Sequence, residues 1–306
     1  MTQGVQQDEV ATYLIEHLEG RYPEHSAALR SLCYRDGHFL LGESHPLIFC
    51  HLSGSVPSSD IFKDLSAAYV LTCAQFFLLD AAVDGHLDSV SLLVYLPVLQ
   101  STATAFLATG IRFCDPASQG RIWLLLERAA AQNASAMLAE SRSLWDIDEA
   151  TDRASIVGRS NCALAYYQIF CIVGGTAAEG RVLDMIEEFI VLVQESDDLS
   201  DWRDDLSSGR VTPFLRRIAT RLGRPFEVER VESHLYLTGA YEKEVLSLIA
   251  RVDGLLSTLE HESEERTASL RSILTRFRGS LVAGLAQMLT LKRAATADSS
   301  RQWIGT

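Results

Sequence analysis

The chain has 306 residues, of which 47% are hydrophobic and 22% charged, and its formal net charge at pH 7 is −13. The hydrophobic fraction is high enough to build a sizeable core, which excludes a disordered protein, and the length excludes a small disulfide-stapled secreted fold. A nucleic-acid partner is unfavourable because the phosphate backbone repels this net charge. We therefore expect a soluble, acidic, globular protein that binds no nucleic acid.

The N-terminal sequence MTQGVQQDEV is polar and acidic and lacks the features of a signal peptide. The longest apolar stretch, residues 67–83, has 17 residues and contains Asp80, so we expect no membrane span. The six cysteines form no CxxC pair and have no histidine at zinc-finger spacing, as is typical of reduced core thiols. The chain has 24 arginines and 3 lysines, a bias that a GC-rich genome produces. We expect a cytoplasmic, bacterial protein.

Hydrophobic residues recur with a period of 3.6 along nearly every long segment, which predicts helices. The clearest patterns lie over residues 117–140, 241–259 and 267–292. Asp60 and the pair Asp115–Pro116 are typical of helix starts. Prolines and glycines predict the breaks, which we place at Pro23, Gly37, 53–60, Pro97, 115–116, 174–175, Gly209, Pro213 and 223–225.

We predict one all-α domain over residues 1–306, a bundle of roughly ten helices with a core at about 60–290. The first few residues and the tail after Ala295 are expected to be loose. Several helices are apolar on more than one face, and such helices are buried or line an interior space.

The first cluster of acidic residues follows an apolar run that includes Phe76 and Phe77. Asp80, Asp84 and Asp88 are spaced by four, so on a helix they share one face. An aspartate triad of this kind also occurs on solvated helix faces, and whether Asp88 takes part is left open.

The second cluster, residues 194–205, reads QESDDLSDWRDD and interrupts a strongly apolar helix. Asp197, Asp201 and Asp205 again follow a spacing of four. Stacked carboxylates repel one another, at ~4 Å by about 4 kcal/mol for an effective dielectric near 20. A fold tolerates them when the face is solvated or when a cation neutralises it, and Mg²⁺ prefers such oxygen ligands. Two clusters that each end an apolar helix favour a metal site.

These motifs resemble those of the class I isoprenoid synthase superfamily, which includes terpene synthases and trans-prenyl diphosphate synthases. Residues 194–201, continued by Asp205, Gly209 and Arg210, are similar to the second motif of prenyl diphosphate synthases, Q-x-x-D-D-x-x-D. Asp80 and Asp84 match the first motif in the reduced form D-x-x-x-D. The resemblance covers roughly residues 60–290 and implies a helical bundle around an apolar cavity.

The resemblance implies that three Mg²⁺ ions bridge the two motifs to a substrate diphosphate. Asp80 and Asp84 would hold two ions and would be catalytic, and Asp197, Asp201 and Asp205 would hold the third, with Asp198 beside them. Metal ions and basic side chains stabilise a diphosphate leaving group, and an apolar aromatic pocket shields the resulting carbocation.

Candidate partners of the diphosphate lie before and after the second motif. Arg153 and Arg159 stand where the family places a diphosphate-sensing arginine or a Lys-Thr pair, and Arg159 is also a catalytic candidate. Arg153 and Arg159 each also fit an ordinary surface residue, and Arg210 is the third candidate. The side chains expected to line the apolar pocket are Phe76, Phe77, Tyr166 and Phe170, although core packing is a common role of such aromatics.

The chain departs from both branches of the superfamily. Chain-elongating enzymes bind isopentenyl diphosphate through G-K-x-x-R and R-R-G segments, which this sequence lacks. Its metal triad also replaces the usual Asn, Ser/Thr and Glu of cyclases by aspartates. We interpret the chain as a class I terpene synthase that ionises and cyclises geranylgeranyl or farnesyl diphosphate, with C20 favoured. The alternatives are a chain-elongating prenyltransferase with a divergent isopentenyl site and a non-catalytic helical protein of this fold. Homodimerisation, which is common in the superfamily, is left open.

Overall fold

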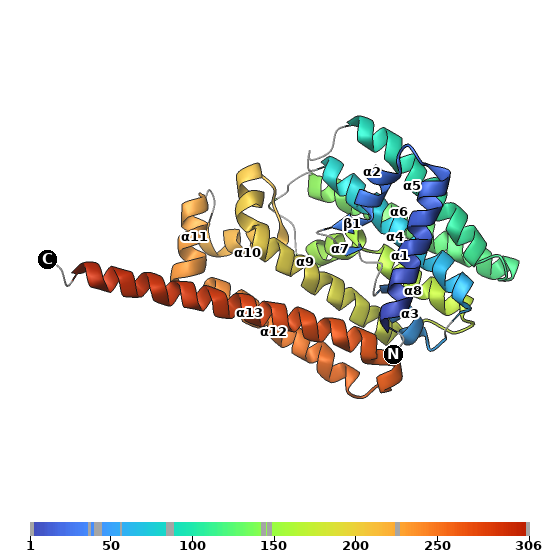
Figure 1. The fold of residues 1–306 in the computed structure, drawn as a ribbon. Helices are drawn as coiled ribbons and strands as arrows, with labels where there is room; N and C mark the ends of the chain where they lie inside the picture. Colours follow the sequence, from blue (N-terminus) through green and yellow to red (C-terminus); the bar gives the residue numbers. More distant parts are fainter. Residues whose placement is uncertain are drawn as a thin grey trace. The chain divides into compact units, whose positions relative to one another are not determined.

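The computed structural model describes residues 3–35, 38–39, 45–55, 57–83, 89–141, 145, 149–223 and 227–303. Over these residues the chain forms thirteen helices and one two-stranded hairpin, which confirms the all-α prediction (Figure 1). The chain divides into two compact units, Met1–Val191 and Leu192–Thr306, and the boundary falls inside helix α9. The single domain expected from the sequence stays a prediction.

The first unit contains every element up to the first half of α9. Its helices are α1 (Gln3–Arg21), α2 (Ser26–Leu32), α3 (His45–Ser53), α4 (Ser59–Val83), α5 (Ser89–Gly110), α6 (Pro116–Ser141), α7 (Glu149–Arg159), α8 (Cys162–Val173) and the start of α9 (Gly180–Ser208). Its strands are β1 (Tyr34–Arg35) and β2 (His38–Phe39), paired antiparallel. The break predicted at Gly37 falls between these strands, at a residue outside the described ones.

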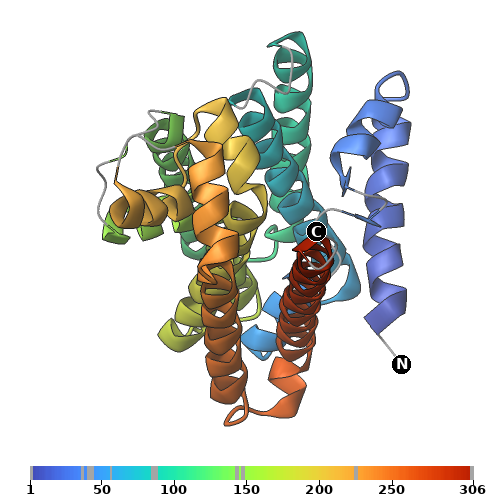
Figure 2. The same cartoon turned by 90° about the vertical axis from the view of Figure 1, so that its left-hand side faces the viewer.

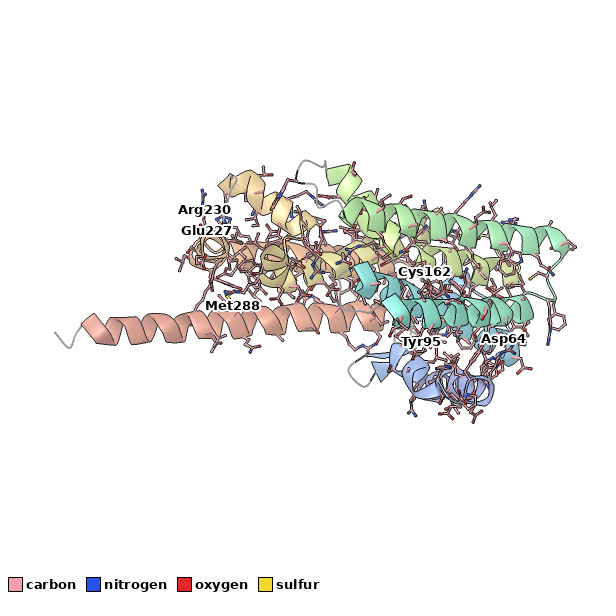
Figure 3. The ribbon with its side chains drawn as sticks, turned by 90° about the horizontal axis from the view of Figure 1, so that it is seen from above. Asp64, Tyr95, Cys162, Glu227, Arg230 and Met288 are labelled. Atoms are coloured by element: carbon pink, nitrogen blue, oxygen red, sulfur yellow. The ribbon has the colours of Figure 1, made fainter. Side chains whose placement is uncertain are left out.

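Helix α4 is the centre of the first unit and packs against α1, α3, α5, α6 and α8. Its residues Leu65, Val70 and Leu71 are completely buried. The hydroxyl of Tyr13 on α1 donates a hydrogen bond to Asp64 Oδ1 over 2.7 Å, which ties α1 to α4 (Asp64 is labelled in Figure 3). Burial of this kind explains why the α4 sequence is apolar on more than one face.

Among the described residues, two helices are long and apolar enough to cross a membrane by length and composition, and the bent pair of residues 151–159 and 162–173 would be a third if it formed one span. The two helices are Ser59–Ala82 in α4, with a mean hydropathy of 1.5, and Val90–Gly110 in α5, with 1.6. Both are longer than the 17-residue stretch on which the sequence-based expectation rested. The absence of a membrane span stays a prediction.

Helix α5 corrects the prediction of a break at Pro97, because the helix continues through this proline. A proline in a helix leaves the carbonyl four residues earlier without its N–H partner. Pro97 is exposed, and Leu93, the residue whose carbonyl loses its N–H partner, is 74% exposed. Solvent can therefore satisfy this carbonyl, and the helix tolerates the proline.

Helix α6 begins where capping chemistry predicted. Asp115 Oδ1 accepts hydrogen bonds from the backbone N–H groups of Ala117 and Ser118 over 2.9 and 3.0 Å, and Pro116 occupies the first helical position. The hydrogen bond from the Ser118 hydroxyl lowers the pKa of Asp115. The predicted start of this helix is confirmed.

Helices α7 and α8 form a bent pair with an angle of 61° between residues 151–159 and 162–173. The predicted break at Gly174–Gly175 is confirmed as the end of α8, and Gly175 has a φ of +70°. The bend at Ser160–Asn161 was not predicted. It lies where α7 comes very close to α6: a side chain at Gly158 would meet Ala136 Cβ at 3.0 Å.

The second unit contains the end of α9 followed by α10 (Pro213–Leu222), α11 (Val228–Leu237), α12 (Ala240–Leu259) and α13 (Glu264–Trp303). Helices α12 and α13 lie side by side along much of their length (Figures 1 and 2), and both were predicted from periodicity. Val252, Leu259 and Leu274 on these two helices are buried. The tail after Ala295, expected to be loose, is helical to Trp303.

Candidate functional site

The acidic segment 194–205 lies within the continuous helix α9, as its spacing required. Asp197 and Asp201, one helical turn apart, are both exposed. Asp198 is buried, and its Oδ1 accepts a hydrogen bond from Gln194 Nε2 over 3.0 Å. The helix therefore exposes two successive carboxylates while it turns a third inward.

Glu195 fixes the acidic half of α9 within the second unit. Its carboxylate accepts hydrogen bonds from Arg217 on α10, over 3.4 Å, and from Arg251 on α12. The Glu195 side chain is only 15% exposed, so these ion pairs are partly shielded from water. Neither arginine was predicted to take part in the site. The network sets the rotation of α9 against α10 and α12.

Asp205 and Arg210 are brought together at the end of α9. Gly209 has a φ of +77°, a left-handed conformation that reverses the chain. The Arg210 backbone N–H then donates to the Asp205 carbonyl over 2.8 Å, and the Arg210 guanidinium pairs with Asp205 Oδ1 over 2.9 Å. Asp205 was predicted to bind metal and Arg210 to bind diphosphate. Each holds the other in this structure, so a metal ion on Asp205 or a diphosphate on Arg210 would compete with this ion pair.

The first acidic cluster lies at the end of α4. Asp80 belongs to the last helical turn and is partly exposed. Asp84 and Asp88 lie outside the described residues, so their predicted roles stay predictions. Upstream, Phe76 is partly exposed and Phe77 is 37% exposed.

The two candidate arginines on α7 have different surroundings. The Arg153 guanidinium pairs with Glu187 Oε1 over 3.1 Å and with Glu188 Oε2 over 3.0 Å, both on α9. It bridges two helices of the first unit, and any contact with a substrate would compete with these carboxylates.

Arg159 is the last residue of α7, directly before the 61° bend. Its carbonyl accepts a hydrogen bond over 2.9 Å from the side chain of Asn133 on α6, a residue that is 4% exposed. This bond holds the end of α7 in place, and it makes Asn133 a candidate positioning residue for Arg159.

Aromatic side chains from α3, α4 and α8 form a buried cluster in the first unit. The rings of Tyr69 and Tyr166 meet edge to face at 5.1 Å between centroids, and the ring of Phe170 lies 6.1 Å from that of Phe49 and 6.2 Å from that of Phe62. Burial raises the pKa values of Tyr69 and Tyr166, so both hydroxyls stay neutral. Tyr166 and Phe170, predicted to line a substrate pocket, therefore contribute to the core, and their contact with a substrate stays a prediction.

The chemistry of α9 suits a hard divalent cation. Carboxylate oxygens are the ligands that Mg²⁺ prefers, and it commonly takes one or two of them together with water and phosphate oxygens. The exposed pair Asp197 and Asp201 supplies such a set. Within the described residues, which exclude Asp84, no group of three acidic, histidine or cysteine side chains could hold a metal ion. The remaining oxygens would have to come from water and a ligand.

Sequence reasoning missed Asn133 and the role of Glu195. Asn133 lies in a regular helical pattern, 26 residues before its partner, and nothing in its local sequence marks it. Glu195 stands inside the acidic motif, where it looks like one more carboxylate. Only the fold identifies its arginine partners, which lie 22 and 56 residues away.

Comparison with known proteins relates the chain to enzymes through its fold. The sequence matches no protein-family model and no curated protein at a significant level. A structure assigned as a geranylgeranyl pyrophosphate synthase from Corynebacterium glutamicum has a TM-score of 0.66 at 16% identity, covering 89% of this chain and 95% of its own. Heptaprenyl diphosphate synthase from Staphylococcus aureus has a TM-score of 0.63 at 12% identity, covering 91% of this chain and 98% of its own.

A polyprenyl synthase from Caulobacter crescentus, complexed with calcium and isoprenyl diphosphate, has a TM-score of 0.53 at 14% identity, with coverages of 86% and 96%. All these identities are low, and the likeness is one of fold. The chain therefore has the all-α fold of the isoprenoid synthase type.

Proposed function

We propose that this chain is an enzyme of the isoprenoid synthase superfamily that extends an allylic prenyl diphosphate with isopentenyl diphosphate. The observation that carries the proposal is the fold likeness to prenyl diphosphate synthases over most of the chain, together with the Q-x-x-D-D-x-x-D motif of α9. The sequence alone favoured cyclisation. The structural neighbours support chain elongation better, because the three structures named above carry the names of prenyl synthases.

Asp197 and Asp201 are the residues that we propose as Mg²⁺ ligands on α9, with Asp80 and Asp84 as those of the first motif. Bound Mg²⁺ would neutralise the charge that develops on the diphosphate leaving group. The number of ions implied by the resemblance, three, stays a prediction. Asp198 and Glu195 support this half of α9 through Gln194, Arg217 and Arg251.

Other side chains of this chain would bind the diphosphate and shield the carbocation. Arg159 at the bend between α7 and α8 would bind diphosphate oxygens, since a guanidinium forms paired hydrogen bonds with phosphate. Arg210 is the candidate diphosphate ligand of the second unit, where a diphosphate would compete with its pair to Asp205. Phe76 and Phe77, which are partly exposed in the turn of α4 before Asp80, would shield a carbocation from water.

Cyclisation of a single diphosphate is the second candidate, and the supply of basic residues favours it. The lysines are Lys63, Lys243 and Lys292. Lys63 pairs with Glu9 over 3.2 Å, and Lys292 pairs with Glu242. Two of the three lysines are therefore engaged within the units, and a second diphosphate would have to rely on arginines.

Incubation with geranyl, farnesyl and geranylgeranyl diphosphates, labelled isopentenyl diphosphate and Mg²⁺ separates these reactions. We expect labelled products that are longer by five-carbon units, identified by mass spectrometry after dephosphorylation. Unlabelled cyclic hydrocarbons or alcohols would overturn elongation in favour of cyclisation.

A non-catalytic protein of the same fold would give neither product. It would also show no rise in stability with Mg²⁺ and inorganic pyrophosphate. An enzyme that binds these ligands gains about 2.7 kcal/mol in the free energy of unfolding when the ligand concentration is 100 times the Kd.

A further inference from the structure

The first unit contains a surface cavity of about 150 Å³ that is open to solvent and separate from the residues proposed above. It lies between α6, α8 and the turn after α8. Arg121, Leu125 and Arg128 line it from α6, and Gln168, Ile172 and Thr176 line it from α8 and the turn. Arg121 and Arg128 are seven residues apart, so they project from the same face of α6.

Neither arginine has an ion-pair or hydrogen-bond partner among the described residues, although both side chains line the same cavity. By contrast, Arg153, Arg217 and Arg251 each pair with a carboxylate. A bound anion would supply the opposite charge that these two guanidinium groups lack.

The rest of the lining combines one more donor with apolar walls. Gln168 Nε2 donates one hydrogen bond to the Leu164 carbonyl over 3.2 Å, which leaves its second N–H available. The Thr176 hydroxyl donates its hydrogen bond to the Cys171 carbonyl over 3.3 Å. Thr176 therefore lines the cavity without offering it a donor. Leu125 and Ile172 supply hydrocarbon surface.

These features select the chemical class of the ligand. Two guanidinium forks carry two positive charges and more donors than one carboxylate can accept, and they match the three oxygens of a dianionic phosphate group. A volume of about 150 Å³ is roughly that of five water molecules, enough for the phosphate and a few carbon atoms.

We infer that this cavity binds a small phosphate monoester with a short aliphatic chain, held by Arg121, Arg128 and Gln168. The site is independent of the proposed function, since none of its residues belongs to the acidic motifs or the aromatic cluster.

The test is a calorimetric titration of the whole chain with n-butyl phosphate in EDTA. Without Mg²⁺ the aspartates of α9 repel phosphate, so they do not compete for the probe. The variant is Arg121→Gln with Arg128→Gln. The matched control is Lys243→Gln with Arg276→Gln, which also removes two exposed positive charges.

We expect the wild type and the control to bind n-butyl phosphate equally and the arginine variant to bind at least about tenfold more weakly. Inorganic phosphate should bind about fourfold or more weakly than n-butyl phosphate, because it loses the contact with Leu125 and Ile172. Ile172→Ala should narrow that ratio without changing the affinity for inorganic phosphate.

Three results would overturn the inference. They are no binding at millimolar n-butyl phosphate, equal binding by the arginine variant, and butyrate binding as tightly as n-butyl phosphate. Circular dichroism of the variants checks that the exposed substitutions leave the helices intact.

Discussion

The Asn133 side chain donates a hydrogen bond to the Arg159 carbonyl over 2.9 Å, from a position that is 4% exposed. It links the middle of α6 to the last residue of α7, where the chain bends by 61°. Removal of the donor would leave a carbonyl at the bend without its partner and would free the end of α7 to move.

We predict that Asn133→Ala destabilises the fold by about 1–3 kcal/mol. If Asn133 positions Arg159, the variant also lowers kcat more than it raises KM for a prenyl diphosphate. Urea denaturation and steady-state kinetics measure the two effects. Asn133→Asp is the informative second variant, because it keeps the size but removes the donor. Unchanged kcat in both variants would show that Asn133 serves stability alone.

Arg159→Gln and Arg153→Gln should behave differently. Arg153 already bridges Glu187 and Glu188 with a side chain that is 41% exposed, so its loss should cost about 0.5–1 kcal/mol and change turnover only a few-fold. Arg159→Gln should lower kcat/KM by about a hundredfold if it binds the diphosphate. The same kinetic and denaturation assays apply, and a reversed order of effects would assign the substrate contact to Arg153.

The Asp205–Arg210 ion pair should contribute to the stability of the fold. Arg210→Gln leaves the buried Asp205 carboxylate without this cation and should destabilise the protein by about 1–3 kcal/mol. Combining it with Asp205→Asn should recover part of the loss, because the buried charge is removed as well. Urea unfolding of the two single variants and the double variant measures the coupling. If the losses in the free energy of unfolding of the two single variants simply added in the double variant, the predicted coupling between Asp205 and Arg210 would be contradicted.

The stability of the first unit should fall in mild acid because of His45. Burial lowers the pKa of His45 from 6.5 to about 4, and its Nδ1 lies 2.6 Å from the Tyr69 hydroxyl. Between these pKa values the unfolded chain binds the proton and the folded chain does not. The contribution is therefore complete above pH 6.5 and is lost as the pH falls toward 4, by up to about 3 kcal/mol.

Thermal or urea unfolding between pH 7 and pH 4.5 tests this dependence in the wild type and in His45→Gln. The variant should lose stability less steeply over that range, and the exposed His261→Asn serves as the control. An identical slope in His45→Gln and in the wild type would contradict the assignment.

Local signals in the sequence predicted much of the helical structure. Helices α6, α12 and α13 follow from apolar residues at a period of 3.6, and Asp115–Pro116 fixed the start of α6. The break predicted at Pro97 was wrong, because the cost of a proline in a helix depends on whether the carbonyl four residues earlier, here that of Leu93, can be satisfied by solvent. The bend at Ser160–Asn161 depends on the close approach of Gly158 to α6, which a single sequence does not reveal.

The candidate site was predicted in part. The spacing of Asp197 and Asp201 required one helix, and α9 provides it. The burial of Asp198 and the pairing of Asp205 with Arg210 could not be read from the spacing, because periodicity gives a face but not its partners. Arg217 and Arg251 reach Glu195 from other helices, so their role depends on tertiary packing.

The central claim is that the carboxylates exposed on α9 support Mg²⁺-dependent turnover of a prenyl diphosphate. Its most direct test is pyrophosphate release from farnesyl and geranylgeranyl diphosphate, with isopentenyl diphosphate and Mg²⁺ present, by the wild type, Asp201→Asn and Asp184→Asn. Asp184 is an exposed carboxylate near the start of the same helix, so its variant removes the same charge away from the motif. We predict that Asp201→Asn loses about a hundredfold or more in rate and that Asp184→Asn keeps the wild-type rate. Full turnover by Asp201→Asn, or no turnover by the wild type, would contradict the account.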